Sequence, residues 1–260
     1  MKKAVALMLT GLLLSSSFSV SAELFTLSPE ATAVPGQLTP IEAVSAEDTG
    51  DVLDLPDEPV AGLELMTFGH YEQDNDLSDG AEPIEWYVLK RKTGSALLLS
   101  RYALDCRQYN TSYGFCVWDQ AAIRKWLNAD FKTTAFTKEE RAAIKQVTLR
   151  NGHSQTYWSV GDSKKTHDSV FLFSYKEAYE TYFISTELLR CRPTAYALAQ
   201  GVLTHGSEGY CWWWCRSPGH RRFEATIVLD DGDFEYSDVD NTSLGVRPLI
   251  WVDLTNKVFK

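Results

Sequence analysis

The pattern of apolar and polar positions after about residue 60 predicts short strands and short helices in irregular order. Two β-prone runs, residues 83–90 and 95–100, flank the turn Lys92-Thr93-Gly94 and predict a hairpin. The dipeptide Asp231-Gly232 predicts a second hairpin turn. Further strand-like runs cover residues 147–150, 170–173, 210–215, 225–229, 234–236 and 246–252. No βαβ rhythm or internal repeat is present, so we predict an α+β domain with an antiparallel sheet and much irregular loop.

Polar capping residues mark the expected helices. Asp119 is placed to cap a helix that continues to about Asn128. The segments 137–140 and 174–177 have the spacing of capping boxes, and they predict helices that reach about residues 146 and 183. A further helical turn is expected over residues 193–199.

The first 22 residues have the pattern of a cleavable secretory signal peptide. Lys2 and Lys3 precede an apolar run, and Val20-Ser21-Ala22 has small residues where a signal peptidase cuts. The apolar run is shorter than the roughly 20 residues that a membrane-spanning helix needs. We therefore expect a secreted or extracytoplasmic bacterial protein whose mature chain has no membrane span.

The net charge of −10 belongs mainly to a leading segment. Residues 23–60 contain nine acidic residues, five prolines and no Lys or Arg, whereas residues 61–260 contain 26 acidic and 23 basic residues. Such a composition predicts that residues 23–62 are a disordered acidic linker; an ordered arm is the alternative. Residues 63–260 would then form one domain. Because no basic footprint is present, a nucleic-acid partner is not expected.

The five cysteines leave several pairings open. In an oxidising compartment Cys106 could pair with Cys116, and Cys191 could pair with Cys211 or Cys215. The sequence Cys211-Trp212-Trp213-Trp214-Cys215 is similar to a metal or redox motif. In a regular strand, however, its two thiols would lie about 13 Å apart, which favours a packing role.

A set of short motifs resembles a bacterial family of secreted domains, domain of unknown function 6273, over roughly residues 63–254. That family is itself similar in pattern to the formylglycine-generating-enzyme and C-type-lectin-like folds. The resemblance implies a single compact C-type-lectin-like (sulfatase-modifying-factor-like) domain, and it supplies no function. The motifs are Phe68-Gly69, Ile84–Trp86, Leu99–Cys106, Ile123–Asn128, Phe131, Ala135-Phe136, Phe171–Ser174, Pro193–Ala197, Trp213-Trp214, Arg216–Gly219 and Gly245–Pro248.

The candidate binding residues come from the most specific motifs. Arg216, Ser217 and Arg247 are expected to contact a ligand; the alternative is that both guanidinium groups bond loop carbonyls. Three consecutive tryptophans in an alternating strand cannot all face the core. Trp212 and Trp214 are therefore candidate stacking surfaces for sugar rings.

Metal binding has two weak candidates. The acidic segment 230–233, with Asp238, Asp240 and Asn241, offers oxygen ligands for calcium, although an acidic hairpin turn explains the same residues. The resemblance to the oxidase fold implies copper at a cysteine pair, here Cys211 and Cys215. We assign no catalytic residue and no resident metal or cofactor.

These observations predict a non-catalytic extracytoplasmic domain that binds a glycan or a surface protein. One alternative is a copper oxidase of the formylglycine-generating type. The other is a structural appendage or secreted factor without a small ligand.

Overall fold

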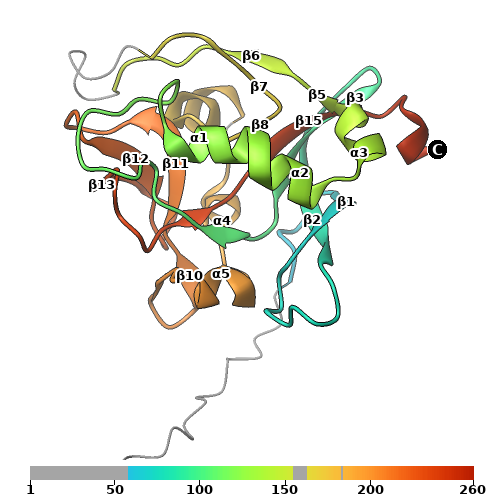
Figure 1. The fold of residues 1–260 in the computed structure, drawn as a ribbon, viewed down its shortest axis with the longest axis horizontal. Helices are drawn as coiled ribbons and strands as arrows, with labels where there is room; N and C mark the ends of the chain where they lie inside the picture. The colour runs from blue at the N-terminus through green and yellow to red at the C-terminus, as the bar shows by residue number, and fades with distance from the viewer. Residues whose placement is uncertain (1–57, 155–162, 183) are drawn as a thin grey trace, which may run out of the picture. The chain divides into compact units, whose positions relative to one another are not determined.

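Strands build two larger sheets and two strand pairs in the C-terminal part of the chain (Figure 1). This computed structural model describes residues 58–154, 163–182 and 184–260, which belong to one compact unit that begins at Pro56. The predicted signal peptide and nearly all of the predicted linker lie outside the described residues. The structure is a mixture of mostly antiparallel sheet and short helices, so the predicted α+β class is confirmed.

The first sheet has six antiparallel strands. Its path is β1 (Leu65–Tyr71), β2 (Glu82–Lys92), β3 (Ser95–Ser100), β15 (Leu249–Asp253) and β5 (Ile144–Lys145), and β8 (Val170–Phe171) also pairs with β15. The predicted hairpin of β2 and β3 is confirmed. One residue of β2, Leu89, bulges out of the pairing with β3, because Val88 lies opposite Leu98 and Lys90 lies opposite Leu97.

The second sheet has five strands in the order β13 (Phe234–Asp238), β12 (Glu224–Val228), β11 (Trp213–Pro218), β14 (Gly245–Val246) and β4 (Asp105–Cys106). Only β11 and β14 are parallel. The strand pairs are β6 (Val147–Leu149) with β7 (Thr166–Asp168) and β9 (Thr204–His205) with β10 (Tyr210–Cys211). The β12–β13 hairpin turns at Asp231-Gly232, as predicted.

The helices are short. The π-helical turn η1 (Leu127–Phe131) joins α1 (Ala122–Trp126) to α2 (Lys132–Ala135), and this rod packs on β8 and β1 (Figure 1). The others are α3 (Lys138–Ala143), the π-helical η2 (Glu177–Thr181), α4 (Thr186–Leu189), α5 (Ala195–Ala199) and the 3₁₀ turn η3 (Lys257–Phe259). No described helix has the length and apolar content that a membrane crossing requires.

Both predicted capping boxes are present, and the predicted cap at Asp119 is wrong. Thr137 and Glu140 bond each other's backbone N–H groups at the start of α3. Ser174 Oγ likewise accepts from Glu177 N (3.1 Å), and Glu177 accepts from Ser174 N (3.2 Å). Helix α1 instead begins after Ala121, because the Asp119 carboxylate is occupied by the Ser163 hydroxyl (2.7 Å).

Two predicted strands each split into two. The run 210–215 breaks at Trp212, where the chain leaves the β9–β10 pair and enters the second sheet. The run 246–252 breaks at Arg247-Pro248, since proline has no N–H to donate to a ladder. Strand β7 and helix α4 were not predicted.

Four tryptophans form much of the core. Trp86, Trp118, Trp213 and Trp214 are fully buried, and each indole N–H reaches an acceptor. Trp86 donates to the Phe68 carbonyl (2.7 Å) and Trp118 donates to Asp168 (2.9 Å). Because their polar atoms are satisfied, these large side chains contribute apolar burial without an unpaired donor.

Gly69 permits a close approach between β1 and the α2–α3 connection. Its φ is +73°, and an added Cβ would lie 2.5 Å from the Phe136 ring and 2.7 Å from the Ala135 carbonyl oxygen. Gly209 has a similar φ, +70°, but nothing lies within 4 Å of its added Cβ.

This contrast predicts different costs for the same substitution. Gly209→Ala should lower the free energy of unfolding by about 1 kcal/mol through backbone strain alone. Gly69→Ala should lower it by about 3 kcal/mol, because the clash adds to that strain. Urea unfolding of both variants measures the difference, and equal losses would show that the Phe136 contact does not constrain Gly69.

Candidate functional site

A buried ion pair between Arg216 and Glu177 lies at the centre of the candidate site. Arg216 is on β11 and is 2% exposed. Its Nη2 donates to Glu177 Oε1 (2.6 Å), and its Nη1 contacts the other oxygen of the same carboxylate. The pairing is therefore bidentate, which fixes the orientation of both side chains.

The remaining donors of Arg216 hold two further segments. Nη1 also donates to the Leu172 carbonyl (2.7 Å), and Nε donates to Asn151 Oδ1 (3.0 Å). One guanidinium group thus ties together β11, the chain after β8, the start of η2 and the chain after β6. The stretch 172–177, Asn151 and β11 are far apart in sequence and meet only in the folded domain.

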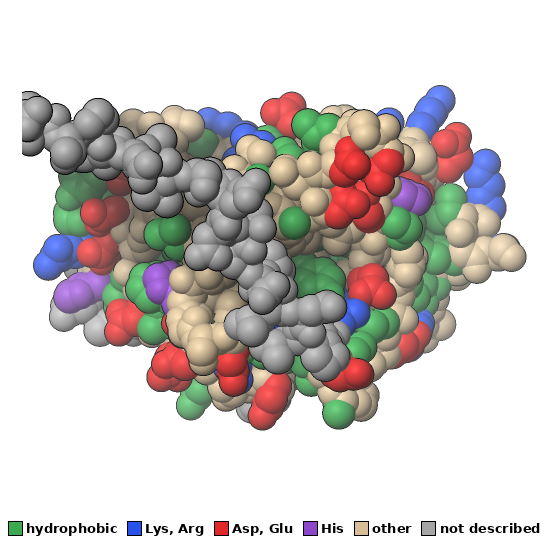
Figure 2. Space-filling view, turned by 90° about the horizontal axis from the view of Figure 1, so that it is seen from below, with side chains coloured by type: hydrophobic (Ala, Val, Ile, Leu, Met, Phe, Trp, Pro, Cys, Tyr) green, Lys and Arg blue, Asp and Glu red, His purple; other side chains and the backbone are tan. Residues whose placement is uncertain are grey.

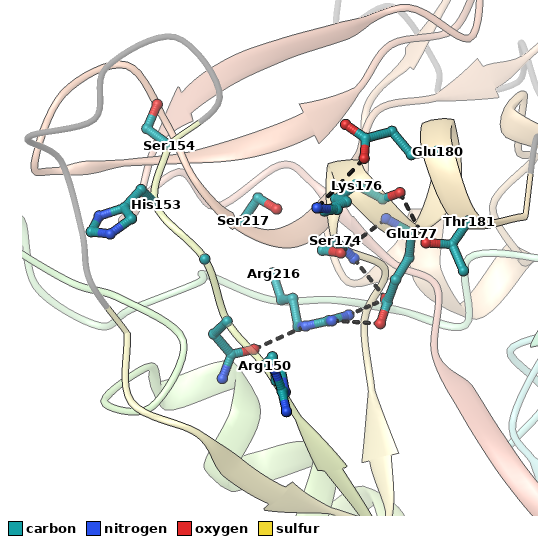
Figure 3. A pocket seen from close by; sticks show the side chains of 12 residues that line it. Arg150, His153, Ser154, Ser174, Lys176, Glu177, Glu180, Thr181, Arg216 and Ser217 are labelled. Atoms are coloured by element: carbon teal, nitrogen blue, oxygen red, sulfur yellow. Dashed lines mark hydrogen bonds and ion pairs between the residues drawn. The ribbon is translucent and has the colours of Figure 1, made fainter.

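A polar cavity of about 480 Å³ opens beside this ion pair (Figure 3). Arg150, His153 and Ser154 come from the chain after β6, and Lys176, Glu180 and Thr181 come from η2 and its start. We call this cavity the polar compartment. It is lined by Arg150, Asn151, Gly152, His153, Ser154, Ser174, Lys176, Glu177, Glu180, Thr181, Arg216 and Ser217.

A second cavity, of about 310 Å³, has aromatic and cationic walls. We call it the aromatic compartment. Trp251 and Tyr182 are half-buried, while Phe171 is buried beneath them in the lining. It is lined by Lys92, Ser95, Lys145, Val147, Thr148, Leu149, Phe171, Glu177, Tyr182 and Trp251.

The two cavities are compartments of one groove, because they share Glu177 and follow the same two stretches of chain. One wall runs from β6 into residues 150–154, and the other runs from η2 to Tyr182. Glu177 stands between the aromatic surface and the polar surface. Since Arg216 holds its carboxylate on both oxygens, this divider has a fixed position.

The serines of the polar compartment have local structural partners. Ser217 Oγ accepts from Tyr175 N (3.0 Å), and Ser174 Oγ accepts from Glu177 N (3.1 Å). Lys176 forms an exposed ion pair with Glu180 (3.6 Å). The arrangement offers many hydrogen-bonding groups to a ligand, and its hydroxyl groups serve as caps in the described structure.

Comparison with known proteins identifies the family. The family described as Domain of unknown function (DUF6273) matches residues 93–254. The chain belongs to this family. No curated protein and no solved structure matches it. The matched region of the DUF6273 domain contains Arg216, Glu177, Lys145 and Trp251, whereas Lys92 lies just before it. It is shorter than the stretch 63–254 expected from the motifs, since β1 and the whole of β2 fall outside it.

Arg247 of the DUF6273 domain supports the backbone. It is 1% exposed, and its guanidinium group donates to the carbonyls of Ser100 (3.0 Å), Leu188 (2.6 Å) and Arg101 (3.4 Å). We therefore revise its expected role as a ligand contact, because a ligand would have to replace these bonds. Arg216 is also buried and saturated, but it forms part of the groove lining, and so does Ser217.

The candidate tryptophans lie outside the groove. Trp214 is fully buried and donates to the Arg107 carbonyl (2.8 Å), so it cannot stack on a sugar, and we revise that expectation. Trp212 is half-buried, as expected for one of three consecutive tryptophans. Its ring stacks on His205 with centroids 3.9 Å apart, and its Nε1 donates to Asp230 (2.7 Å).

The acidic segment near Asn241 forms turns. Asn241 Oδ1 accepts from Ser243 N (2.9 Å), and Asp231 accepts from Asp233 N (3.0 Å). These local bonds agree with an acidic hairpin turn. Among the described residues, the acidic side chains close enough to share one ion are at another place, on the β1–β2 connection: Glu72, Asp74 and Glu82.

The cysteines are all buried and free. The predicted disulfide between Cys106 and Cys116 is absent, because Cys106 Sγ contacts the Thr242 carbonyl (3.0 Å). Cys191 and Cys211 are in side-chain contact without a bond. Burial raises the pKa of the Cys106 and Cys116 thiols to about 11.

Cys211 and Cys215 lie in separate surroundings. The pKa of Cys211 is raised by burial and by the thiol of Cys191, whereas the pKa of Cys215 is raised by burial, which outweighs the lowering effect of Arg216. The break between β10 and β11 separates the two residues into different sheets. The sequence motif therefore does not form a thiol pair in this structure.

The sequence did not single out Glu177, Asn151 or Trp251 as site residues. Glu177 is recognisable only as a capping-box residue, and its partner Arg216 is 39 positions away. The one available signal for Trp251 was its place between the buried residues Ile250 and Val252, which puts it on the opposite face of its strand.

The buried guanidinium of Arg247 predicts a large stability effect. Arg247→Met should lower the free energy of unfolding by about 3–5 kcal/mol, because it leaves several buried carbonyl groups without donors. Arg221→Met changes an exposed side chain and should cost less than about 0.5 kcal/mol. Urea unfolding compares the two, and a loss below about 1 kcal/mol for Arg247→Met would contradict the backbone-support role.

Thiol titration tests the cysteine arrangement. A raised pKa means that little thiolate exists at pH 8, so the folded protein should react slowly with a disulfide reagent. After unfolding in guanidinium chloride without reductant, all five thiols should react. If only three thiols react, one pair has formed a disulfide. Cys191 and Cys211 are the pair that is already in contact.

Proposed function

We propose that this DUF6273 domain is a non-catalytic binding module that recognises a glycan outside the cytoplasm. One observation carries the proposal: an aromatic surface and a polar cavity meet at the fixed carboxylate of Glu177. Sugar rings have apolar C–H faces that pack on aromatic side chains, and their hydroxyl groups need hydrogen-bonding partners. The groove offers both kinds of surface side by side.

The size of the groove suits such a ligand. Its compartments, of about 480 and 310 Å³, each fall in the range of small-molecule sites. An oligosaccharide of a few units could place one ring on Trp251 and a neighbouring unit beside Glu180 and His153. A fixed lining favours binding, because less conformational entropy is lost when the ligand enters.

Rigidity of the lining comes from the Arg216 network. Glu177 and Asn151 are positioned by the same guanidinium group before any ligand is present. Their remaining lone pairs and N–H groups would be available to sugar hydroxyls at defined positions. This arrangement is what a site of modest size needs in order to select between sugars that differ only in hydroxyl orientation.

Two finer expectations accompany this proposal. Export of the protein rests on the signal-peptide pattern of residues 1–22. A C-type-lectin-like architecture rests on the resemblance between sequence motifs, and the antiparallel sheets with long irregular connections are compatible with it. Both expectations fit a domain that meets glycans at a cell surface.

A glycan array followed by calorimetry tests the proposal. The glycans that bind should lose at least about tenfold in affinity to Trp251→Ala, because stacking on an aromatic ring contributes about 1–3 kcal/mol. Trp212→Ala is the matched control, since Trp212 is a half-buried tryptophan outside the groove. Its affinity should change less than twofold.

Three results would overturn the proposal. One is the absence of any glycan bound by a demonstrably folded protein. The second is a glycan whose affinity depends on Trp212 and not on Trp251, which would place the site at the surface expected from the sequence. The third is a surface protein that binds through the same groove while no glycan competes with it.

A further inference from the structure

Three lysines lie on one face of the first sheet, where Lys92 and Lys145 line the aromatic compartment and Lys90 lies beside its Tyr182 ring. Strand pairing places Lys90, Leu97, Trp251 and Lys145 in one row across β2, β3, β15 and β5. The next row contains Lys92, Ser95 and Asp253. Because residues two apart on a strand share a face, both rows present their side chains on the same side of the sheet.

The bulge at Leu89 is what brings Lys90 to this face. Val88 pairs with Leu98, so a regular strand would place Leu89 opposite Leu97 and would turn Lys90 to the other side. With Leu89 unpaired, Lys90 lies opposite Leu97 instead. Arg91, on the opposite face, forms an ion pair with Glu64.

The lysine side chains are close to the aromatic rings. Lys92 Nζ lies 4.8 Å from the centroid of Trp251, and Lys90 Nζ lies 5.7 Å from the centroid of Tyr182. Lys145 Nζ donates to Ser95 Oγ (3.0 Å). In the described part of the chain none of the three ammonium groups forms an ion pair.

The charges around the aromatic compartment favour an anion. Glu177 is neutralised by Arg216, and Asp253 is the other acidic group near the lysines, engaged by Thr255 N (3.0 Å) and Oγ1 (2.7 Å). Three lysines therefore lie near one carboxylate that has no ion-pair partner among the described residues, although residues 61–260 contain more acidic than basic side chains. Figure 2 views the domain from below the orientation of Figure 1, and on that face acidic side chains gather in clusters while basic ones lie mostly at the edge.

We propose that the aromatic compartment recognises a carboxylated sugar, such as a uronic acid. This inference rests on the proposed glycan-binding function and names the class of its ligand. The carboxylate would lie between the ammonium groups of Lys92 and Lys145, with the sugar ring against the indole of Trp251. Lys92 already rests on this indole, so an anionic group brought to the ring meets its ammonium group directly.

A comparison of acidic oligosaccharides with their methyl esters tests this inference. Oligomers of galacturonic, glucuronic and mannuronic acid are titrated into the full chain by calorimetry, each beside the ester that keeps the ring and removes the charge. At least one acid should bind at least about tenfold more tightly than its ester, since a charge-assisted hydrogen bond contributes about 1.5–3 kcal/mol. The preference should weaken as salt is raised, because exposed charges are screened.

Charge variants locate the interaction. Lys145→Gln and Lys92→Gln should each weaken acid binding about fivefold to tenfold and leave ester binding within about twofold. Asp253→Asn should strengthen acid binding, because it removes the neighbouring negative charge. Lys138→Gln removes an exposed lysine on α3 and is the control, with no expected change.

The outcomes separate this inference from the function on which it rests. Equal affinity for acid and ester, with dependence on Trp251, would retain glycan binding and overturn the acidic-sugar inference. An acid preference that survives both lysine substitutions would also overturn it. If sodium acetate competes at the same concentration as the oligosaccharide, the site binds a simple anion equally well. This result would contradict recognition of a sugar.

Discussion

The groove of this domain is held together mainly by the interactions of one group, the guanidinium of Arg216. It satisfies the Glu177 carboxylate and the Leu172 carbonyl from one stretch of chain and the Asn151 side-chain amide from another, and it does so while 2% exposed. Burial of an ion pair is costly, and it is offset only when every donor has an acceptor. In this domain the bonds that hold the segments together also form the floor of the cavity and the wall between its two compartments.

Arg247 also supplies donors to backbone carbonyl groups, but it does not line the groove. Both arginines come from strongly patterned motifs late in the chain, and both direct donors to carbonyl groups at or next to the ends of strands and helices. A domain with short strands and long connections has many carbonyl groups that no ladder can satisfy, and an arginine supplies five donors in one planar group. The difference lies in the partner: Arg216 also meets the carboxylate of Glu177 at the edge of the groove, whereas the hydrogen bonds of Arg247 go to backbone carbonyl groups and its guanidinium group lies over the Trp213 ring.

Most local signals were read correctly from the sequence, with the cap at Asp119 as an exception, and signals that depend on tertiary contacts were not. The capping boxes at Thr137 and Ser174 and the hairpins at Gly94 and Gly232 are encoded within a few residues, so their spacing was sufficient. The breaks at Trp212 and Arg247 depend on which sheet each half joins. The groove depends on a partnership between residues 177 and 216 that has no local signature. The aromatic candidates from the sequence were therefore Trp212 and Trp214, whereas the groove contains Trp251, whose exposure is set by the layers that cover its sheet.

Because of its bulge, strand β2 tolerates the loss of a residue at one position and not at another. Leu89 is the residue without a cross-strand partner, so a related chain that lacked it would retain every pairing between β2 and β3 and every lysine on its present face. The loss of a residue further along, at Arg91, would let Leu89 enter the ladder and would carry Lys90 to the side of Glu64. The charge on one face of the sheet therefore depends on the number of residues in β2 as well as on their identity.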